Sequence, residues 1–332
     1  MVKPRFDGLS GCHIKPIRSV NHAANLALIT AGRLDSFRKN GKRPVLFLHG
    51  SMSPTLLTGA YRIGGLSWFD FLSMDTRSVW GLDFLGYGES DPYPAAWQQE
   101  MGHDPNDYGG ASSQMAEIDN AVTRILASTG ADSLHVVAIS RGSIPAGYYA
   151  AAYPEKVRSL IFHAPITRND GKALALLVKY FGSVALPRIS HFAMSAEQHF
   201  EFVRDDKPPG TISPLEPEFA ASWTSDYSQR VHGDPYKADL PVLAPIGFAV
   251  DIHNAWNGIY FDESGITMPT LIFRGEWDQR LTPADGCQEL FEGIASPVKR
   301  YLQLSQATHS MMYETCRHTI YRESAAFLRE HD

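Results

Sequence analysis

A strand-to-helix junction at Ser140 constrains the fold of this chain more than any other feature. The apolar run Val136–Ile139 ends at this serine, and a small-residue turn then leads directly into a helix-forming stretch. In such a junction one residue takes a strained backbone conformation and presents its side chain outward, while strand and helix pass closely. Small residues are then needed two positions before and after it, and Ala138 and Gly142 occupy those positions. The pattern predicts a nucleophile elbow; a buried serine at a strand end is the alternative.

Two later segments carry an acid and a base in positions that suit such a serine. The β-rich run Pro269–Gly275 predicts a strand, and Asp278 follows it. The run Arg300–Leu304 predicts a short strand, and His309 follows in the next loop, ahead of a long amphipathic helix. Serine, acid and histidine in this chain order, each after a strand, form a known catalytic arrangement. We therefore predict that the serine, Asp278 and His309 act together as a catalytic triad.

Together these motifs resemble the α/β-hydrolase superfamily, and the resemblance covers nearly the whole chain. Val45–Gly50 is similar to the third strand and His-Gly turn of that family, and Gly81–Ser90 is similar to the segment after its fourth strand. Ala138 stands where the family usually has glycine, and a single methyl group is the least intrusive replacement. The resemblance is to serine hydrolases with a cap domain, in the esterase or proline-iminopeptidase-like branch. It implies an α/β-hydrolase fold: a mostly parallel eight-stranded sheet flanked by helices, with an inserted, mainly helical cap.

The resemblance also assigns roles to individual groups. His309 would accept the serine proton as the hydroxyl attacks a carbonyl, and Asp278 would orient and stabilise that histidine. The oxyanion hole would use two backbone N–H groups, one from Arg141 and one from the loop after the third strand. Met52 is the residue we favour for the second donor, and Ser51 is the alternative. His49, beside a glycine in the same loop, is expected to be structural.

The spacing of the predicted strands indicates one catalytic core interrupted by an insertion. We predict an α/β-hydrolase core formed by residues 1–165 and 268–332, with a cap, or lid, formed by residues 166–267. The regular alternation of strands and helices is lost in this insertion, which is too long for a plain loop and is rich in aromatic residues. An aromatic roof over the serine favours an apolar acyl or alcohol group, and Pro/Gly-rich hinges would let the roof open. Candidate substrate-binding residues are Ser51, His163, Trp223 and Trp256.

A structural role is the alternative for two of these candidates. His163 ends a predicted strand, where a core or rim histidine is common. Most aromatic residues of the insertion, Trp223 among them, are expected to pack the cap onto the core.

Composition restricts the partners and the compartment. A net charge of −6 without a basic run does not favour nucleic acid. The three cysteines, Cys12, Cys287 and Cys316, are widely spaced and odd in number, so we expect no disulfide framework. No histidine pair has metal-binding spacing, so we expect neither a metal nor a cofactor. The start, Met1–Phe6, is followed by no long apolar stretch, and we expect a cytoplasmic protein without a transmembrane segment. The sequence leaves the oligomeric state open.

These observations predict a serine hydrolase that cleaves an ester, thioester or amide of a small, largely apolar molecule through an acyl-serine intermediate. Esterase activity is favoured over peptidase activity. The serine nucleophile argues against haloalkane dehalogenases and epoxide hydrolases, which use aspartate at this position. Acyl transfer to another acceptor, C–C bond hydrolysis and lyase chemistry use similar triads and stay open. A receptor-like, ligand-binding role on the same scaffold is a further alternative.

Overall fold

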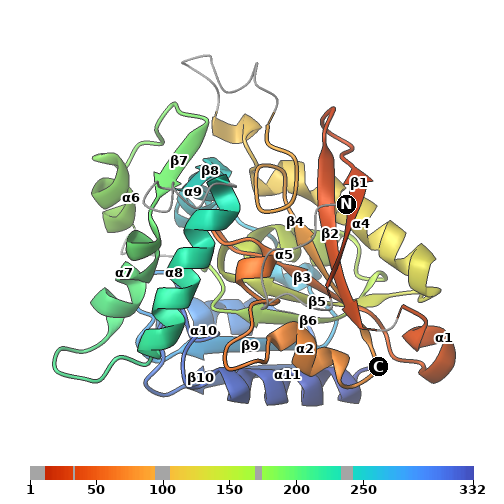
Figure 1. Ribbon diagram of the computed structural model, residues 1–332. Helices are drawn as coiled ribbons and strands as arrows, with labels where there is room; N and C mark the ends of the chain where they lie inside the picture. Colours follow the sequence, from red (N-terminus) through yellow and green to blue (C-terminus); the bar gives the residue numbers. More distant parts are fainter. Residues whose placement is uncertain (1–11, 33, 94–104, 169–173, 233–241) are drawn as a thin grey trace.

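One twisted sheet organises the molecule. A computed structural model describes residues 12–32, 34–93, 105–168, 174–232 and 242–332. Within these residues, eight strands form a sheet in the order β1-β2-β4-β3-β5-β6-β9-β10 (Figure 1). β2 pairs antiparallel with both of its neighbours, whereas β4 to β10 along this order are parallel. The predicted mostly parallel eight-stranded sheet is therefore confirmed. The strands are β1 (His13–Arg18), β2 (Asn25–Gly32), β3 (Val45–Leu48), β4 (Ser78–Asp83), β5 (Leu134–Ile139), β6 (Val157–His163), β9 (Thr270–Gly275) and β10 (Lys299–Leu304).

The apolar runs of the sequence become the central strands because both faces of the sheet are covered. Successive side chains of a strand point to opposite faces. Val136 of β5 accordingly packs in a cluster with helix residues of one face, while Val137 packs in the cluster of the other face. All residues of β3, β4, β5 and β9 are buried, whereas the edge strand β1 is largely exposed. Continuous apolar runs of this kind are typical of strands buried on both faces.

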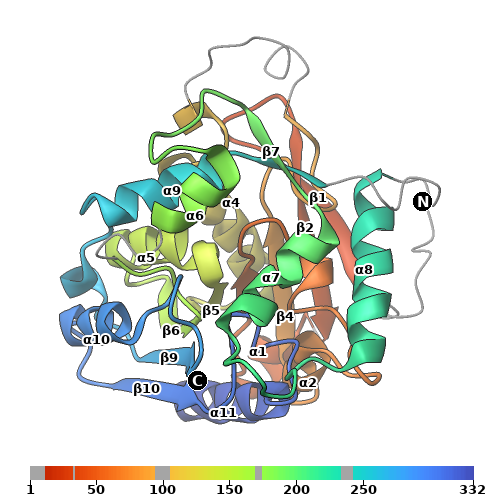
Figure 2. The same ribbon diagram turned by 90° about the vertical axis from the view of Figure 1, so that its left-hand side faces the viewer.

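Helices cover the two faces as the strand pattern requires. The first cluster includes residues of α4, α5 and α10, and the second includes residues of α2 and α11 (Figures 1 and 2). The helix predicted directly after the Ser140 turn and the long helix predicted after His309 are both present. The bounds are α1 (Ser36–Asn40), α2 (Trp68–Ser73), α4 (Ala111–Thr129), α5 (Ser143–Ala152), α10 (Ala284–Gly293) and α11 (Arg317–Glu330), with short 3-10 turns η2 (Thr55–Leu57), η3 (Pro105–Asp107) and η4 (Ser140–Gly142).

Between β6 and β9 the chain leaves the sheet and builds a separate layer. Figure 2 shows α6, α7 and α9 of this segment beside the core, with α8 at its flank. A two-stranded antiparallel sheet, β7-β8, accompanies these helices, and the sequence did not predict it. The elements are α6 (Leu174–Phe181), β7 (His191–Met194), α7 (Ala196–Asp206), α8 (Pro217–His232), β8 (Val242–Pro245), α9 (Gly247–Trp256) and η6 (Glu263–Gly265).

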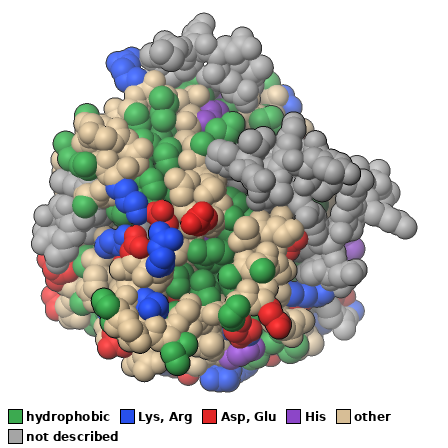
Figure 3. Space-filling view, turned by 60° about the vertical axis from the view of Figure 1, so that its left-hand side comes forward, with side chains coloured by type: hydrophobic (Ala, Val, Ile, Leu, Met, Phe, Trp, Pro, Cys, Tyr) green, Lys and Arg blue, Asp and Glu red, His purple; other side chains and the backbone are tan. Residues whose placement is uncertain are grey.

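The outer surface of this segment carries ion pairs, while part of its apolar side chains are buried against the core. Lys179 of α6 pairs with Glu201 and Asp205 of α7. Figure 3 shows basic and acidic side chains interspersed on this side of the molecule, with hydrophobic ones around them. Leu176 and Leu177 of α6 are buried on the opposite side. Residues 1–11, which include Met1–Phe6, lie outside the described residues. None of the described helices combines the length and the apolar character that crossing a bilayer requires.

Candidate active site

The strand-to-helix junction at Ser140 has the strained geometry that its sequence predicts. Ser140 has a φ angle of 51°, which is a left-handed backbone conformation that residues other than glycine rarely adopt. It directly follows β5, and α5 begins within three residues. A Cβ atom on Gly142 would lie 2.5 Å from the carbonyl oxygen of His49, so only glycine fits there. Gly50 also packs closely against the serine on the other side, where a Cβ would lie 3.1 Å from the Cβ of Ser140. The turn therefore presents the serine hydroxyl at the carboxyl end of the central strand.

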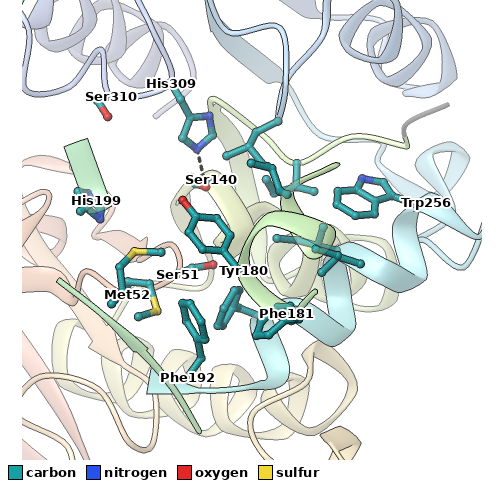
Figure 4. Close-up of a pocket in the computed structure, with 18 residues that line it drawn as sticks. Ser51, Met52, Ser140, Tyr180, Phe181, Phe192, His199, Trp256, His309 and Ser310 are labelled. Carbon is teal, nitrogen blue, oxygen red and sulfur yellow. Dashed lines mark hydrogen bonds between the residues drawn. The ribbon is translucent and has the colours of Figure 1, made fainter. Parts of the chain in front are cut away.

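The structure brings Ser140, Asp278 and His309 together from three separate loops. The Oγ of Ser140 lies 2.7 Å from Nε2 of His309 (Figure 4). On the other side of the ring, Nδ1 of His309 lies 2.6 Å from Oδ2 of Asp278. A carboxylate can only accept hydrogen bonds, so Nδ1–H donates to Asp278. Nε2 is then left as the acceptor for the serine hydroxyl. The second oxygen of Asp278 accepts the backbone N–H of Thr282 at 3.1 Å, which holds the carboxylate in place.

The loops that carry the acid and the histidine are bound to each other. The backbone N–H of Trp277 donates to the carbonyl of Ala307 at 2.8 Å. A Cβ on Gly275 would lie 2.4 Å from the carbonyl oxygen of Thr308, so glycine at the end of β9 allows this approach. The buried carboxylate of Glu314 accepts the backbone N–H of Thr308 at 3.0 Å. These contacts fix the position of the histidine that follows.

Burial and mutual attraction shift the pKa values of His309 and Asp278 in opposite directions. Burial lowers the pKa of His309, but the charge and hydrogen bond of the adjacent Asp278 carboxylate raise it by more. The pKa of His309 therefore lies above the usual histidine value. Burial favours the neutral form of Asp278, yet the charge and hydrogen bond of His309 hold its pKa below the usual range. Asp278 is thus ionised at neutral pH although it is fully buried. The pair can stabilise an imidazolium formed when the serine loses its proton.

A further carboxylate reaches this pair from α7. The side chain of Asp206 is 3% exposed, and its Oδ1 accepts a hydrogen bond from Nε of Arg280 at 2.5 Å. Arg280 lies two residues after Asp278, so this ion pair links α7 to the acid loop. Burial, together with the Asp278 charge, raises the pKa of Asp206 to about 6. The negative charge of Asp206 in turn contributes to the raised pKa of His309. The sequence contains no signal that distinguishes Asp206 from a surface acid.

The loop after β3 approaches the serine with a backbone that is also strained. Met52 has φ 65°, and its N–H has no hydrogen-bond acceptor within the described part of the chain. His49 plays a structural part: its Nδ1 lies 2.7 Å from the carbonyl oxygen of Gly50, and its Nε2 accepts the N–H of Phe84 at 3.1 Å. Burial lowers the pKa of His49 to about 3, so the ring is neutral. Asp83 shapes the base of this region by accepting the N–H of Thr55 at 2.8 Å.

A largely apolar pocket opens over Ser140 and has a volume of about 100 Å³. One wall comes from α6 and another from α9, where pocket residues recur at spacings that place them on one helix face. Figure 4 shows aromatic rings of both walls around the serine. Apart from Ser140, His309 and Ser310, the lining consists of Ser51, Met52, Ile166, Leu176, Leu177, Tyr180, Phe181, Phe192, Met194, His199, Phe248, Ala249, Ile252, Trp256 and Leu281.

Two of the four predicted substrate-binding residues line this pocket. Ser51 and Trp256 contribute to its wall. Trp223 does not: its ring is fully buried, stacks on Tyr227, and donates from Nε1 to the carbonyl of Leu57 at 3.0 Å. It therefore packs α8 against the core. His163 also lies outside the pocket wall, fully buried at the end of β6, where burial lowers its pKa to about 3.

The side chain of Arg141 anchors the α9 wall to the elbow. Its guanidinium group is 1% exposed and pairs with the buried carboxylate of Asp251 on α9, with Nε at 2.6 Å from Oδ2. Nη1 donates to Oε1 of Gln114 at 2.7 Å, and Nη2 donates to the carbonyl of Gly109. The side chain is turned into the protein, so only the backbone N–H of Arg141 is a candidate to face a substrate.

The arrangement of potential metal ligands can be checked within the described residues. Among them, no three His, Cys, Asp or Glu side chains are grouped in a way that could hold a metal ion. Cys12, Cys287 and Cys316 are not joined in disulfide bonds.

Comparison with known proteins agrees with this architecture. A serine hydrolase from the polyaromatic hydrocarbon-degrading bacterium Cycloclasticus zankles has a TM-score of 0.63 at 13% identity, covering 96% of this chain and 98% of its own. An α/β hydrolase fold protein from Chitinophaga pinensis has a TM-score of 0.65 at 13% identity, covering 97% and 99%. The 2-hydroxy-6-oxo-6-phenylhexa-2,4-dienoate hydrolase of a Rhodococcus species has a TM-score of 0.60 at 15% identity, covering 96% and 99%.

Sequence comparison identifies the family directly. No curated protein sequence matches the chain. The sequence profile described as the alpha/beta hydrolase fold matches residues 43–315, which include the elbow and both of its partners. The chain therefore belongs to the α/β hydrolase fold family.

Proposed function

We propose that the protein is a serine hydrolase that cleaves an ester of a small, largely apolar molecule through an acyl-serine intermediate. The observation that carries this proposal is the hydrogen-bonded chain from Ser140 through His309 to Asp278, with distances of 2.7 and 2.6 Å. Such a chain makes a serine hydroxyl nucleophilic, because the histidine removes its proton as attack begins. A structural serine would need no such partners.

The reaction then follows from the positions of these groups. The hydroxyl oxygen of Ser140 attacks the substrate carbonyl while Nε2 of His309 takes the proton. The oxyanion is stabilised by the backbone N–H groups of Met52 and Arg141. The protonated His309 returns its proton to the leaving alcohol, which leaves an acyl-serine. Water, deprotonated by the same histidine, attacks this acyl group. His309 then returns that proton to the Ser140 oxygen as the acyl–oxygen bond breaks, which releases the acid and restores the free enzyme.

Residues 166–267 serve in this proposal as the cap that covers the serine. Their contribution to the pocket supports the role, because α6 and α9 supply most of its apolar side chains. The buried pair between Arg141 and Asp251 attaches α9 firmly to the core. The ion pair between Asp206 and Arg280, whose side chain is 26% exposed, attaches α7 to the loop that carries Asp278.

The character of the lining supports an ester substrate over a peptide with a free amino terminus. A protonated amine needs a carboxylate near the serine, and no acidic side chain of the described residues lines this pocket. Two acids of the cap are engaged elsewhere: Glu201 pairs with Lys179, and Glu216 pairs with Arg317. Solved structures of the same fold include enzymes named as a monoacylglycerol lipase and a thioesterase domain. These names agree with acyl ester chemistry.

Hydrolysis of p-nitrophenyl esters tests the proposal. We expect turnover that increases from acetate to a medium-length or aromatic acyl group, because the pocket is apolar. Ser140→Ala removes only the hydroxyl oxygen and should abolish turnover with the fold unchanged by circular dichroism. Ser128→Ala, on the exposed side of α4, is the matched control and should keep full activity. Unchanged turnover by Ser140→Ala would refute the proposal.

A further inference from the structure

A second cavity adjoins the apolar pocket and differs from it in chemistry. Its volume is about 50 Å³, and it shares Ser140 and His309 with the larger pocket, so both cavities meet at the reacting hydroxyl. The apolar pocket is walled by α6 and α9, whereas the second cavity is formed mostly by the loops after β3 and β10. Its polar lining comprises Ser51, Ser53, Thr58, His199, Ser310 and Tyr313.

Some of these polar groups are already engaged, and others are free to meet a ligand. Thr58 donates to the carbonyl of Pro54 at 3.0 Å, and Tyr313 donates to the carbonyl of Leu57 at 2.8 Å. The hydroxyls of Ser51 and Ser310, by contrast, make no hydrogen bond to any described residue. Hydroxyl groups beside a reaction centre can each donate one hydrogen bond and accept others.

His199 stands at the boundary of the two cavities. It belongs to α7, which begins at a capping box formed by Ser195 and Gln198. Its ring stacks on Trp223 with centroids 4.7 Å apart, and its Nε2 lies 3.4 Å from Oγ of Ser53. Figure 4 shows His199 on the side of Ser140 opposite to Trp256. Burial, and to a smaller extent the nearby charge of His309, lowers the pKa of His199 to about 4. The ring is therefore neutral, with one donor and one acceptor nitrogen.

We propose that this second cavity binds a small, uncharged, hydrogen-bonding group of the substrate, such as a hydroxyl on a short chain, while the apolar pocket binds its hydrocarbon part. Besides the triad, no ionised side chain of the described residues lines the cavity. A charged group of the substrate would therefore find no counter-charge there, and an uncharged group fits better. One water needs about 10–15 Å³ of such space, so the cavity holds roughly three to five heavy atoms. The expected substrate is thus an ester with an apolar group on one side of the scissile bond and a polar, uncharged group on the other. His199 and Ser310 would be the residues that select the polar side. This inference rests on the proposed function.

Two pairs of isosteric esters test it, each comparing a hydroxyl with a methyl group. The first pair is 2-hydroxyethyl phenylacetate and propyl phenylacetate, with the polar group on the alcohol. The second is phenethyl glycolate and phenethyl propionate, with the polar group on the acid. We expect kcat/KM to favour the hydroxyl ester by about tenfold or more in one pair, because the cavity pairs its polar groups only with that ester. The pair that responds identifies which half of the substrate occupies the cavity.

Variants separate recognition from a general loss of structure. His199→Phe and Ser310→Ala should each bring the preference in the responsive pair toward unity. His191→Phe is the matched control, because His191 lies in the same segment but outside both cavities, and the preference should persist. Equal kcat/KM within both pairs in the wild type, or a preference that survives both variants, would overturn the inference alone. If no ester of either pair were hydrolysed, the proposed function would fail and this inference with it.

Discussion

Removing the carboxylate of Asp251 should destabilise the protein strongly, because it leaves the Arg141 guanidinium buried without a counter-charge. Arg141 is 1% exposed and Asp251 is 5% exposed, so solvent can replace little of the lost interaction. Breaking a buried ion pair by deleting one partner costs about 3–5 kcal/mol. We therefore expect Asp251→Ala to lower the free energy of unfolding by an amount in that range. The α9 wall of the pocket should loosen at the same time.

Replacing both partners gives the sharper measurement. Arg141→Met together with Asp251→Leu removes both charges and fills the space, which is often close to neutral for a buried pair. The double variant should still be less stable than the wild type, because Gln114 and the N–H of Ala111 lose their hydrogen-bond partners. Urea denaturation of wild type, both single variants and the double variant forms a double-mutant cycle. The double variant should be more stable than Asp251→Leu alone, which also leaves Arg141 without a counter-charge. The proposed role of the Arg141–Asp251 pair would be refuted by either of two results. One is a loss of unfolding free energy below about 1 kcal/mol in Asp251→Ala, and the other is strictly additive unfolding free energies in the cycle.

Three further outcomes follow from the same structure. Asp278→Asn should lower kcat by about 10⁴-fold, because the histidine loses the carboxylate that fixes its tautomer. Steady-state kinetics would show a much smaller loss of kcat if Asp278 had only a structural role. In the proposed mechanism the neutral form of His309 is the base, so kcat/KM should rise with pH through a pKa above the usual histidine value. Asp206→Asn removes a charge that raises the pKa of His309 and should move this rise to lower pH, whereas an unmoved profile would contradict the coupling. Gly147→Ala would place a Cβ 2.3 Å from the ring of Phe261 and should cost about 1–3 kcal/mol in thermal or urea unfolding, and an unchanged midpoint would count against this packing.

Much of the core could be predicted because its elements follow local rules. The short, continuous apolar runs around Val45, Val136 and Ile272 are rich in β-branched and aromatic residues and bounded by turn residues, which favours strands buried on both faces near the centre of a parallel sheet. Parallel strands end at one edge, which is why loops after β5, β9 and β10 converge there. The proximity of the serine, the acid and the histidine follows from this topology and requires no knowledge of side-chain packing.

The pocket was harder to predict because it depends on how helices of the inserted segment are oriented. Trp223 has the size of a pocket residue, yet the burial of its ring and its bond to Leu57 make it part of the packing. The spacing of Phe248, Ile252 and Trp256 did contain a usable signal, since it places all three on one face of α9. His199 and Asp206 had no such signal, because only the docking of α7 brings them to the triad.

Intact-mass measurement after incubation with a fluorophosphonate tests the central claim most directly. Phosphonylation requires a serine hydroxyl that a histidine activates, and it needs no knowledge of the natural substrate. We predict one adduct per chain, mapped to Ser140 by peptide sequencing, formed far more slowly in His309→Ala and absent in Ser140→Ala. A folded wild-type protein that remained unmodified, or an adduct on another residue that persisted in Ser140→Ala, would contradict the account.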